Sequence, residues 1–143
     1  MFEQFDLDQQ LIGGIEKAGY KKPTSIQQLV LPEAMDGKDI LASAPTGTGK
    51  TAAFLLPAAQ HLLDYPRIKP GFPRVLILTP TRELAIQIGE DAKQLTSLTN
   101  IESGVITGGV NYGSHKEILT STTDMLIATP GRLLEYIDNE QFD

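Results

Sequence analysis

The sequence predicts an α/β fold in which a parallel β-sheet is flanked by helices. Four short apolar runs alternate with helix-like segments along the 143 residues, and such alternation is typical of a parallel sheet covered on both faces. A glycine-rich loop joins one apolar run directly to the helix-like segment that follows it. The length suits a single domain with a sizeable core.

A first helix is expected over residues 7–18, where apolar residues recur at helical spacing. Asp8 is a suitable N-cap for this helix, and Gly19 is a suitable C-terminal stop. The adjacent Gly13 and Gly14 weaken the helix, because glycine has a low helix propensity.

A second helix is expected to begin at Thr24, to be broken or restarted at Pro32, and to end at Gly37. Residues 39–44, DILASA, form a short apolar run that predicts a buried strand. A third helix is expected over residues 51–64, directly after the glycine-rich loop.

The second half of the chain continues the alternation after a Pro- and Gly-rich surface loop at residues 65–74. Residues 75–79, VLILT, have no polar alternation and predict a strand that is covered on both faces. The helix expected over residues 82–95 has four apolar side chains on one side: Leu84, Ile88, Ala92 and Leu95. The remaining expected elements are strands at 103–107 and 124–129 and helices at 114–121 and 131–138.

The glycine-rich loop at residues 43–51, SAPTGTGKT, predicts a nucleotide phosphate site. It follows the signature GxxxxGK[ST], except that alanine stands at the first glycine position. Glycines let backbone N–H groups turn towards phosphates, and the helix N-terminus adds positive potential. The alternative is a glycine-rich turn in which the lysine occurs by chance. Such a turn would not require an expected strand, the loop, a Lys-Thr pair and an expected helix to follow one another in this order. The predicted phosphate loop comprises Ala44, Pro45, Thr46, Gly47, Thr48, Gly49, Lys50 and Thr51.

Three other loops follow strands and are also rich in hydrogen-bond donors: TPTRELA, TGG and TPGR. Taken singly, each is explained by helix capping, with Thr81 as one N-cap and Thr129 as another before Pro130 at the first helical position. Taken together, they place donors along one edge of the sheet, because parallel strands end at the same edge. A protein that follows a phosphate backbone needs such a row of donors.

The stretch GYKKPTSIQ has two explanations, between which the residues do not decide. Thr24 and Gln27 have the spacing of a capping box. The Gln27 amide could instead donate to and accept from an adenine edge, with Tyr20 stacking on the ring.

Composition excludes several classes of protein and site. There is no cysteine, so no disulfide or thiolate metal site exists, and no apolar run approaches the length of a membrane span. The acidic N-terminus lacks the features of a signal peptide, which predicts a cytoplasmic protein. The net charge of −6 argues against a broad basic surface, so a nucleic acid would be held by focused contacts. His61 and His115 are isolated and are expected to be packed or solvated.

Five stretches, in this order, resemble the N-terminal helicase core of DEAD-box RNA helicases: GYKKPTSIQ, APTGTGKT, PTRELA, GG and TPGR. The likeness covers essentially the whole chain. It implies a truncated RecA-like P-loop domain, in which residues 1–143 are the N-terminal portion of the ATP-binding helicase domain, with a Q motif at residues 19–27. This family commonly has alanine at the first position of the phosphate loop, so Ala44 is expected.

The resemblance also implies the nucleotide and its contacts. ATP with Mg²⁺ would be the cofactor, and Gln27 and Tyr20 would select adenine. Phe2 would be the isolated aromatic residue upstream of the Q motif, although Phe5 competes for this role.

Catalysis and RNA binding are implied in the same way. Lys50 would contact the outer phosphates and Thr51 would hold magnesium. Because phosphates and sugars have no base identity, the family tolerates many RNA sequences. Two stretches, LLPAAQHLLDYPR and SAPTGTGKTAAF, resemble a bacterial member linked to large ribosomal subunit assembly, which implies ribosomal RNA as the partner. The residues expected to face the RNA backbone are Pro80, Thr81, Arg82, Glu83, Gly108, Gly109, Thr129, Pro130, Gly131 and Arg132.

Several parts of the family pattern are absent from this sequence. It contains no Asp-Glu dipeptide and therefore no D-E-A-D motif, and it lacks the serine–alanine–threonine motif and the second helicase domain with its arginine fingers. We therefore expect a fragment of a longer helicase that is inactive by itself. The alternatives are a small P-loop kinase or GTPase, although no NKxD guanine motif is present, and a stand-alone nucleotide- or RNA-binding module.

Overall fold

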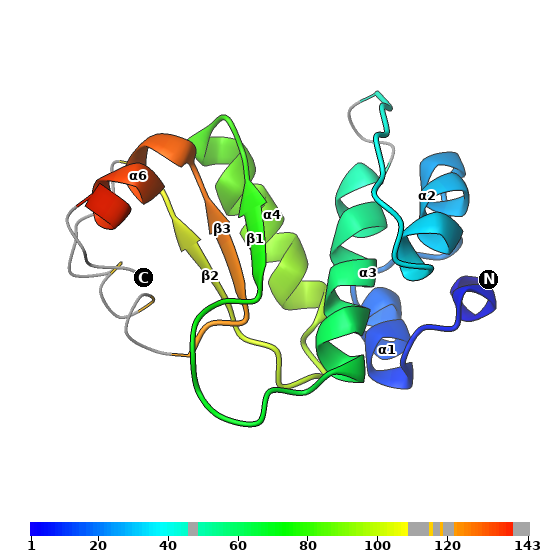
Figure 1. Ribbon diagram of the computed structural model, residues 1–143. Helices are drawn as coiled ribbons and strands as arrows, with labels where there is room; N and C mark the ends of the chain where they lie inside the picture. Colours follow the sequence, from blue (N-terminus) through cyan, green and yellow to red (C-terminus); the bar gives the residue numbers. More distant parts are fainter. Residues whose placement is uncertain (46–48, 109–114, 116–117, 119–121, 139–143) are drawn as a thin grey trace. The chain divides into compact units, whose positions relative to one another are not determined.

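A computed structural model describes residues 1–45, 49–108, 115, 118 and 122–138 (Figure 1). The chain divides into two compact units. The first unit contains Met1–Pro66 and Gln94–Asn100, and the second contains Arg67–Lys93 and Ile101–Asp143.

The first unit is helical. Its elements are the 3-10 helix η1 (Phe2–Phe5) and the α-helices α1 (Gln9–Lys17), α2 (Ser25–Met35) and α3 (Lys50–Asp64). Helix α2 packs along α3, and α1 also contacts α3. The largest fully buried side chains of this unit come from its three α-helices and from the stretch Gln94–Asn100: Leu11, Ile15, Leu31, Leu55, Leu56 and Leu95.

Both predicted ends of α1 are confirmed. The Asp8 carboxylate accepts a hydrogen bond from the Gln10 N–H at 2.8 Å. Gly19 has φ +88°, a left-handed conformation that glycine adopts without strain, and its N–H donates to the carbonyl of Glu16. The helix therefore begins and ends at local signals in the sequence.

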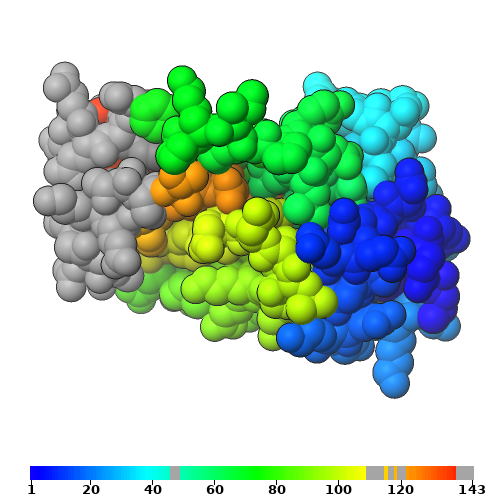
Figure 2. Space-filling view, turned by 90° about the horizontal axis from the view of Figure 1, so that it is seen from below, coloured from blue at the N-terminus to red at the C-terminus, as the bar shows by residue number. Residues whose placement is uncertain are grey.

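The glycine pair in α1 has a packing reason. A Cβ atom on Gly14 would collide with the backbone carbonyl oxygen of Leu95, and a Cβ atom on Gly13 would lie 2.6 Å from the Leu98 side chain. In the space-filling view the blue N-terminal residues lie against the yellow-green segment around residue 98 (Figure 2). The low helix propensity of glycine is therefore offset by close approach of α1 to this segment.

The expected break at Pro32 is wrong, because α2 continues through this residue. A proline inside a helix removes one N–H donor and crowds the carbonyl four residues earlier, here that of Gln28. Both residues are exposed, so water can solvate the released carbonyl. The helix ends as predicted at Gly37, which has φ +81°.

The strand expected over residues 39–44 is also wrong, since this segment has no regular structure. Leu41 is fully exposed at 104% of its reference area. A strand is stable only when its backbone groups pair with a neighbour, and no strand of the described residues pairs with this segment.

The second unit contains the predicted parallel sheet. Its strands are β1 (Val75–Leu78), β2 (Ser103–Ile106) and β3 (Met125–Ala128), in the spatial order β1-β3-β2. Both neighbouring pairs are parallel, and Val75 and Ser103 each lie opposite Met125. The helices expected near these strands are confirmed as α4 (Arg82–Leu95) and α6 (Pro130–Asp138). The helix expected over residues 114–121 lies mostly outside the described residues.

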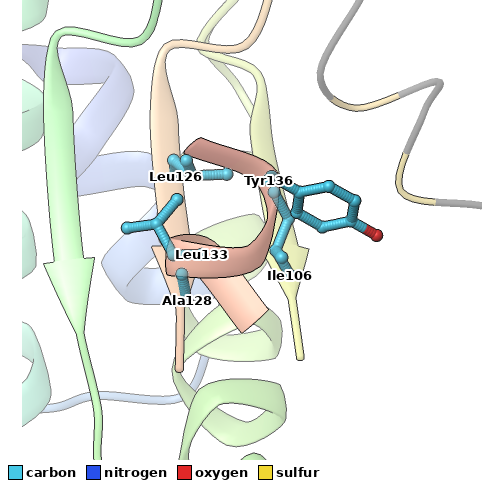
Figure 3. Close-up of a cluster of buried hydrophobic side chains, with 5 residues drawn as sticks. All are labelled: Ile106, Leu126, Ala128, Leu133 and Tyr136. Carbon is cyan, nitrogen blue, oxygen red and sulfur yellow. The ribbon is translucent and has the colours of Figure 1, made fainter. Parts of the chain in front are cut away.

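Helices α4 and α6 cover opposite faces of this sheet. Gly89 of α4 lies so close to Val105 that a Cβ atom would collide with the valine side chain. On the other face, Leu133 and Tyr136 of α6 pack with residues of β2 and β3 (Figure 3). Successive residues of a strand point to opposite faces, so Val105 and Ile106 serve the two helices separately. The sheet with its two helices confirms the predicted α/β class.

Strand β1 is not covered on both faces, contrary to the expectation. Leu76 and Leu78 are 53% and 54% exposed. They point to the same face as Leu126 and Ala128, their partners in β3. In the part of the chain that the structure describes, β1 is an edge strand that pairs with β3 alone, and the α6 cluster covers side chains of β2 and β3. The apolar run therefore predicted the strand correctly, but it did not predict whether other elements would cover both faces of that strand.

The buried stripe of α4 differs by one residue from the expected one. Ala85, Ile88, Ala92 and Leu95 are buried, whereas Leu84 is 43% exposed. The small residues at 85, 89 and 92 let the helix backbone approach its neighbours closely, as the contact of Gly89 with Val105 shows. Close backbone approach therefore outweighed the larger apolar side chain of Leu84 in deciding which side of the helix faces inward.

Candidate functional site

The carboxyl ends of the three strands meet at one edge of the sheet. The ladder continues one residue beyond the strands: the Thr79 N–H donates to the Ala128 carbonyl at 3.0 Å, and the Thr129 N–H donates to the Ile106 carbonyl at 3.1 Å. Thr79, Thr107 and Thr129 therefore lie in a row, and a predicted RNA-facing loop follows each of them. The structure confirms that the three loops share one edge, although Gly109 lies outside the described residues.

The first of these loops is held by its own hydroxyl groups. The Thr79 Oγ1 donates to the Thr81 carbonyl at 3.0 Å, and the Thr81 Oγ1 accepts from the Leu84 N–H at 3.2 Å. Thr81 therefore caps α4, as predicted. Pro80, Thr81, Arg82 and Glu83 are all exposed. Arg82 remains 53% exposed and lies 3.9 Å from the carboxylate of Glu83, which is 79% exposed, so its guanidinium is accessible to a ligand.

The loop after β3 exposes less of its arginine. Pro130 is the first residue of α6, as predicted, and the Leu133 N–H donates to the Thr129 carbonyl at 3.2 Å. The Arg132 side chain is only 14% exposed, and its Nε lies 3.2 Å from Glu135 Oε2. A phosphate bound here would have to share Arg132 with Glu135. The two arginines that the sequence placed on equal terms are thus in different environments.

The phosphate loop leads directly into α3. Gly49 has φ +86° and precedes Lys50, the first residue of the helix. Among the described residues, no side chain forms a capping hydrogen bond at this N-terminus. Lys50 is exposed and Thr51 is half-buried. Ala44 packs partly against α2 and α3, Pro45 is exposed, and Thr46, Gly47 and Thr48 lie outside the described residues.

Gln27 connects the capping box to this loop. The box is confirmed: the Thr24 N–H donates to Gln27 Oε1 at 2.9 Å, and the Gln27 N–H donates to Thr24 Oγ1 at 3.4 Å. The Gln27 Nε2 also donates to the Gly49 carbonyl at 3.1 Å, and the side chain is 1% exposed. A Cβ atom on Gly49 would collide with the Gln27 amide. Glycine is therefore needed at position 49 for both its φ angle and its close contact.

The aromatic residues predicted near adenine lie in the same unit. Phe2 is buried, Phe5 is half-buried, and the centroids of their rings are 6.4 Å apart in an edge-to-face arrangement. Tyr20, half-buried, follows the end of α1, where its N–H donates to the Ile15 carbonyl. Phe5 keeps more surface for a ligand than Phe2, which serves mainly in the core.

Neither histidine belongs to a metal-binding group within the described residues, where no cluster of three histidine or acidic side chains occurs. His61 is exposed, with its ring centroid 5.0 Å from that of Tyr65. His115 is buried beside Tyr136. Across the part of the chain that the structure describes, no helix has the length and hydropathy needed to cross a membrane.

Comparison with known proteins identifies the class to which this fold and these loops belong. Residues 24–143 match the DEAD/DEAH box helicase family. This match covers most of the chain, so the chain belongs to the DEAD/DEAH box helicase family.

Particular relatives are similar over nearly the whole chain. It is 58% identical to the ATP-dependent RNA helicase SrmB of Haemophilus influenzae and 53% identical to SrmB of Escherichia coli, in each case over 99% of this chain and 32% of the relative. It is 46% identical to the ATP-dependent RNA helicase RhlB of Xanthomonas oryzae pv. oryzae, over 95% of this chain and 24% of that protein. The chain thus spans about a third of the length of the SrmB proteins and about a quarter of the length of this RhlB. The resemblance to DEAD-box RNA helicases that the motifs indicated is confirmed.

Proposed function

We propose that this chain is the N-terminal portion of the ATP-binding domain of an ATP-dependent RNA helicase. The observation that carries the proposal is the row of three strand-end loops at one sheet edge, in a chain that belongs to the DEAD/DEAH box helicase family. Membership of this family also argues against a small kinase or GTPase. Ribosomal RNA as the substrate and the cytoplasm as the compartment stay predictions from the sequence.

The nucleotide is ATP with Mg²⁺, bound at the start of α3. Three features fit a triphosphate: the left-handed Gly49, the N-terminus of α3, which no side chain of the described residues caps, and the exposed Lys50. The Thr51 hydroxyl is the one magnesium ligand that we assign in this chain. The ion neutralises charge that develops on the phosphates during transfer.

Adenine selection involves Gln27, although its amide already serves the capping box and Gly49. A side-chain amide has two N–H donors and two acceptor lone pairs, so one of each remains available beyond the two bonds described. These remaining groups match the alternation of donor and acceptor on an adenine edge. Guanine presents the opposite order and would leave them unsatisfied.

Replacement of Gln27 by alanine in the full-length protein is expected to reduce the preference for ATP over GTP about fivefold, the value of one neutral hydrogen bond. Competition of the two nucleotides for one fluorescent analogue measures this ratio. Gln28→Ala is the matched control, because Gln28 is an exposed amide on the same helix. If Gln27→Ala weakens both nucleotides equally, Gln27 acts only through the capping box and the loop.

The strand-end loops bind the RNA backbone. Arg82→Ala in the full-length protein is expected to weaken binding about equally for different RNA sequences and to reduce the slope of log affinity against log salt by about one contact. Arg132→Ala is expected to have the same kind of effect, reduced by the competing Glu135. Filter binding or fluorescence anisotropy over a salt series measures both quantities.

Arg74 is the control for this experiment. It is exposed and stands just before β1, at the opposite end of the strand from Arg82. Arg74→Ala should leave the salt slope unchanged. An equal reduction in all three variants would indicate general electrostatic attraction, and a loss confined to some RNA sequences would indicate base contacts. Either result would contradict backbone binding at this edge.

A further inference from the structure

A buried polar network lies beside the predicted RNA-facing edge, and only one of its three residues, Thr107, belongs to a loop that the sequence identified. The backbone N–H of Thr107 donates to His115 Nε2 at 3.4 Å, and His115 Nδ1 lies 2.6 Å from the Tyr136 hydroxyl. His115 is 1% exposed and Tyr136 is fully buried. The Tyr136 hydroxyl points away from the four apolar side chains with which its ring packs (Figure 3).

The hydrogen bonds determine the protonation state of His115. A backbone N–H can only donate, so Nε2 must hold a lone pair and the ring proton must lie on Nδ1. Nδ1–H then donates to the Tyr136 oxygen. The ring is therefore neutral, in one tautomer. A second proton could bind only at Nε2, where it would face the Thr107 N–H and abolish that bond.

The electrostatic surroundings favour the same neutral state. Burial lowers the pKa of His115, and the positive charge of Arg132 lowers it further. Arg132 is itself paired with Glu135, and among the described residues the other titratable group that contacts the ring is the Tyr136 phenol. Since the folded state disfavours the charged ring, the stability that His115 contributes is complete above its ordinary pKa of about 6.5 and is lost as the pH falls below it.

One partner of His115 stands at the start of a predicted RNA-facing loop, and the other lies on the helix that begins at another such loop. Thr107 directly precedes Gly108, after β2. Tyr136 lies one helical turn beyond Arg132 on α6, the helix that begins with the loop after β3. The two loops are also joined by the backbone bond between Thr129 and Ile106. The His115 imidazole adds a side-chain bridge between the Thr107 N–H, just after β2, and the Tyr136 hydroxyl on α6.

We propose that neutral His115 is a positioning residue that holds Thr107 and Gly108 and the loop at residues 129–132 in one arrangement for RNA phosphates. This inference rests on the proposed function of the strand-end loops. When His115 gains a proton, the bond to Thr107 is lost and the backbone at Thr107 is no longer tied to α6 through this ring. RNA affinity should therefore fall in mildly acidic solution by a step that depends on His115, apart from any contribution of other groups.

The test measures the affinity of the full-length protein for a fluorescent single-stranded oligouridine between pH 8.0 and 5.5 at constant ionic strength. The wild-type protein is expected to lose about fivefold in affinity through this step, the value of one hydrogen bond. His115→Gln keeps a neutral acceptor for Thr107 and cannot gain a proton. Its affinity should stay within about twofold of wild type at pH 7.5, and the acidic step should disappear.

The control variant is His61→Gln, which removes the exposed histidine of α3 and should leave the acidic step unchanged. Tyr136→Phe keeps the packing ring but removes the hydroxyl that accepts from Nδ1, and it should weaken RNA binding at pH 7.5 up to about fivefold. An acidic step of equal size in wild type and His115→Gln would overturn the proposal.

A measurement on the unaltered protein covers the case in which a variant does not fold. Nitrogen-15 NMR of the His115 ring should show a neutral imidazole protonated on Nδ1 at pH 7.5, and its titration midpoint should coincide with the acidic step in RNA affinity. A charged ring at pH 7.5, or two separate midpoints, would overturn the proposal. If Arg82→Ala also leaves RNA binding unchanged, the proposed function is wrong. If Arg82→Ala weakens RNA binding but the acidic step is the same with and without His115, only this inference is wrong.

Discussion

Residues 1–143, purified alone, are expected to release phosphate from ATP orders of magnitude more slowly than a complete RNA helicase. Phosphoryl transfer requires a placed Mg²⁺, an oriented water molecule and positive charge near the transferred group. The chain supplies Lys50 and Thr51 for these tasks. It has no Asp-Glu pair after any strand, and no cluster of three acidic or histidine side chains occurs within its described residues. The loss of one such group costs on the order of 10²- to 10³-fold in rate.

A coupled phosphate-release assay, with and without single-stranded RNA, measures this rate. Lys50→Ala serves as the background, because contaminating ATPases do not depend on Lys50. Turnover that increases with RNA, persists through further purification and disappears in Lys50→Ala would contradict the expectation. Such a result would require a catalytic acid among residues to which we assign no role.

Replacement of Lys50 by alanine is expected to weaken triphosphate binding by roughly ten- to a hundredfold, since a hydrogen bond to a charged group contributes about 1.5–3 kcal/mol. Lys50 is the first residue of α3 and is exposed, and no ion pair of the described residues involves it. Alanine also has the highest helix propensity. The substitution should therefore weaken the binding of the triphosphate without lowering the stability of the folded protein.

Titration with a fluorescent ATP analogue at constant magnesium measures the dissociation constant. Lys38→Ala is the matched control: Lys38 is an exposed lysine whose ammonium group pairs with Glu33 at 2.8 Å. It should leave nucleotide binding unchanged. An unaltered dissociation constant in Lys50→Ala, with a circular dichroism spectrum like that of the wild type, would show that Lys50 does not contact phosphate.

The sequence by itself determined the features that depend on neighbouring residues. The Asp8 cap, the stops at Gly19 and Gly37, the Thr24–Gln27 box and the Thr81 cap all form as predicted. Each is a hydrogen bond or a backbone conformation within a few residues, so the residue types suffice to predict it. The three parallel strands of the sheet and the meeting of their carboxyl ends also followed, because parallel strands with crossover helices must end at one edge.

The tertiary structure decided what depends on partners distant in the chain. The apolar run at 39–44 forms no strand, and Leu76 and Leu78 of β1 remain exposed, because pairing and cover come from other segments that periodicity does not reveal. The choice of Ala85 over Leu84 in the buried stripe of α4 depended on how closely backbones approach.

Among the site residues, the structure showed contacts that residue types alone could not. Gln27 closes its capping box, which the sequence offered as one of two explanations, and it also donates to the Gly49 carbonyl, a contact that the sequence did not indicate. Arg82 and Arg132 look alike in the sequence but differ in exposure, at 53% and 14%, and Arg132 has the closer carboxylate partner. His115 belongs to no motif, and its importance arises from Thr107 and Tyr136, which come from two other elements. Local chemistry is encoded within a few residues, whereas burial and long-range hydrogen bonds exist only once distant segments pack together.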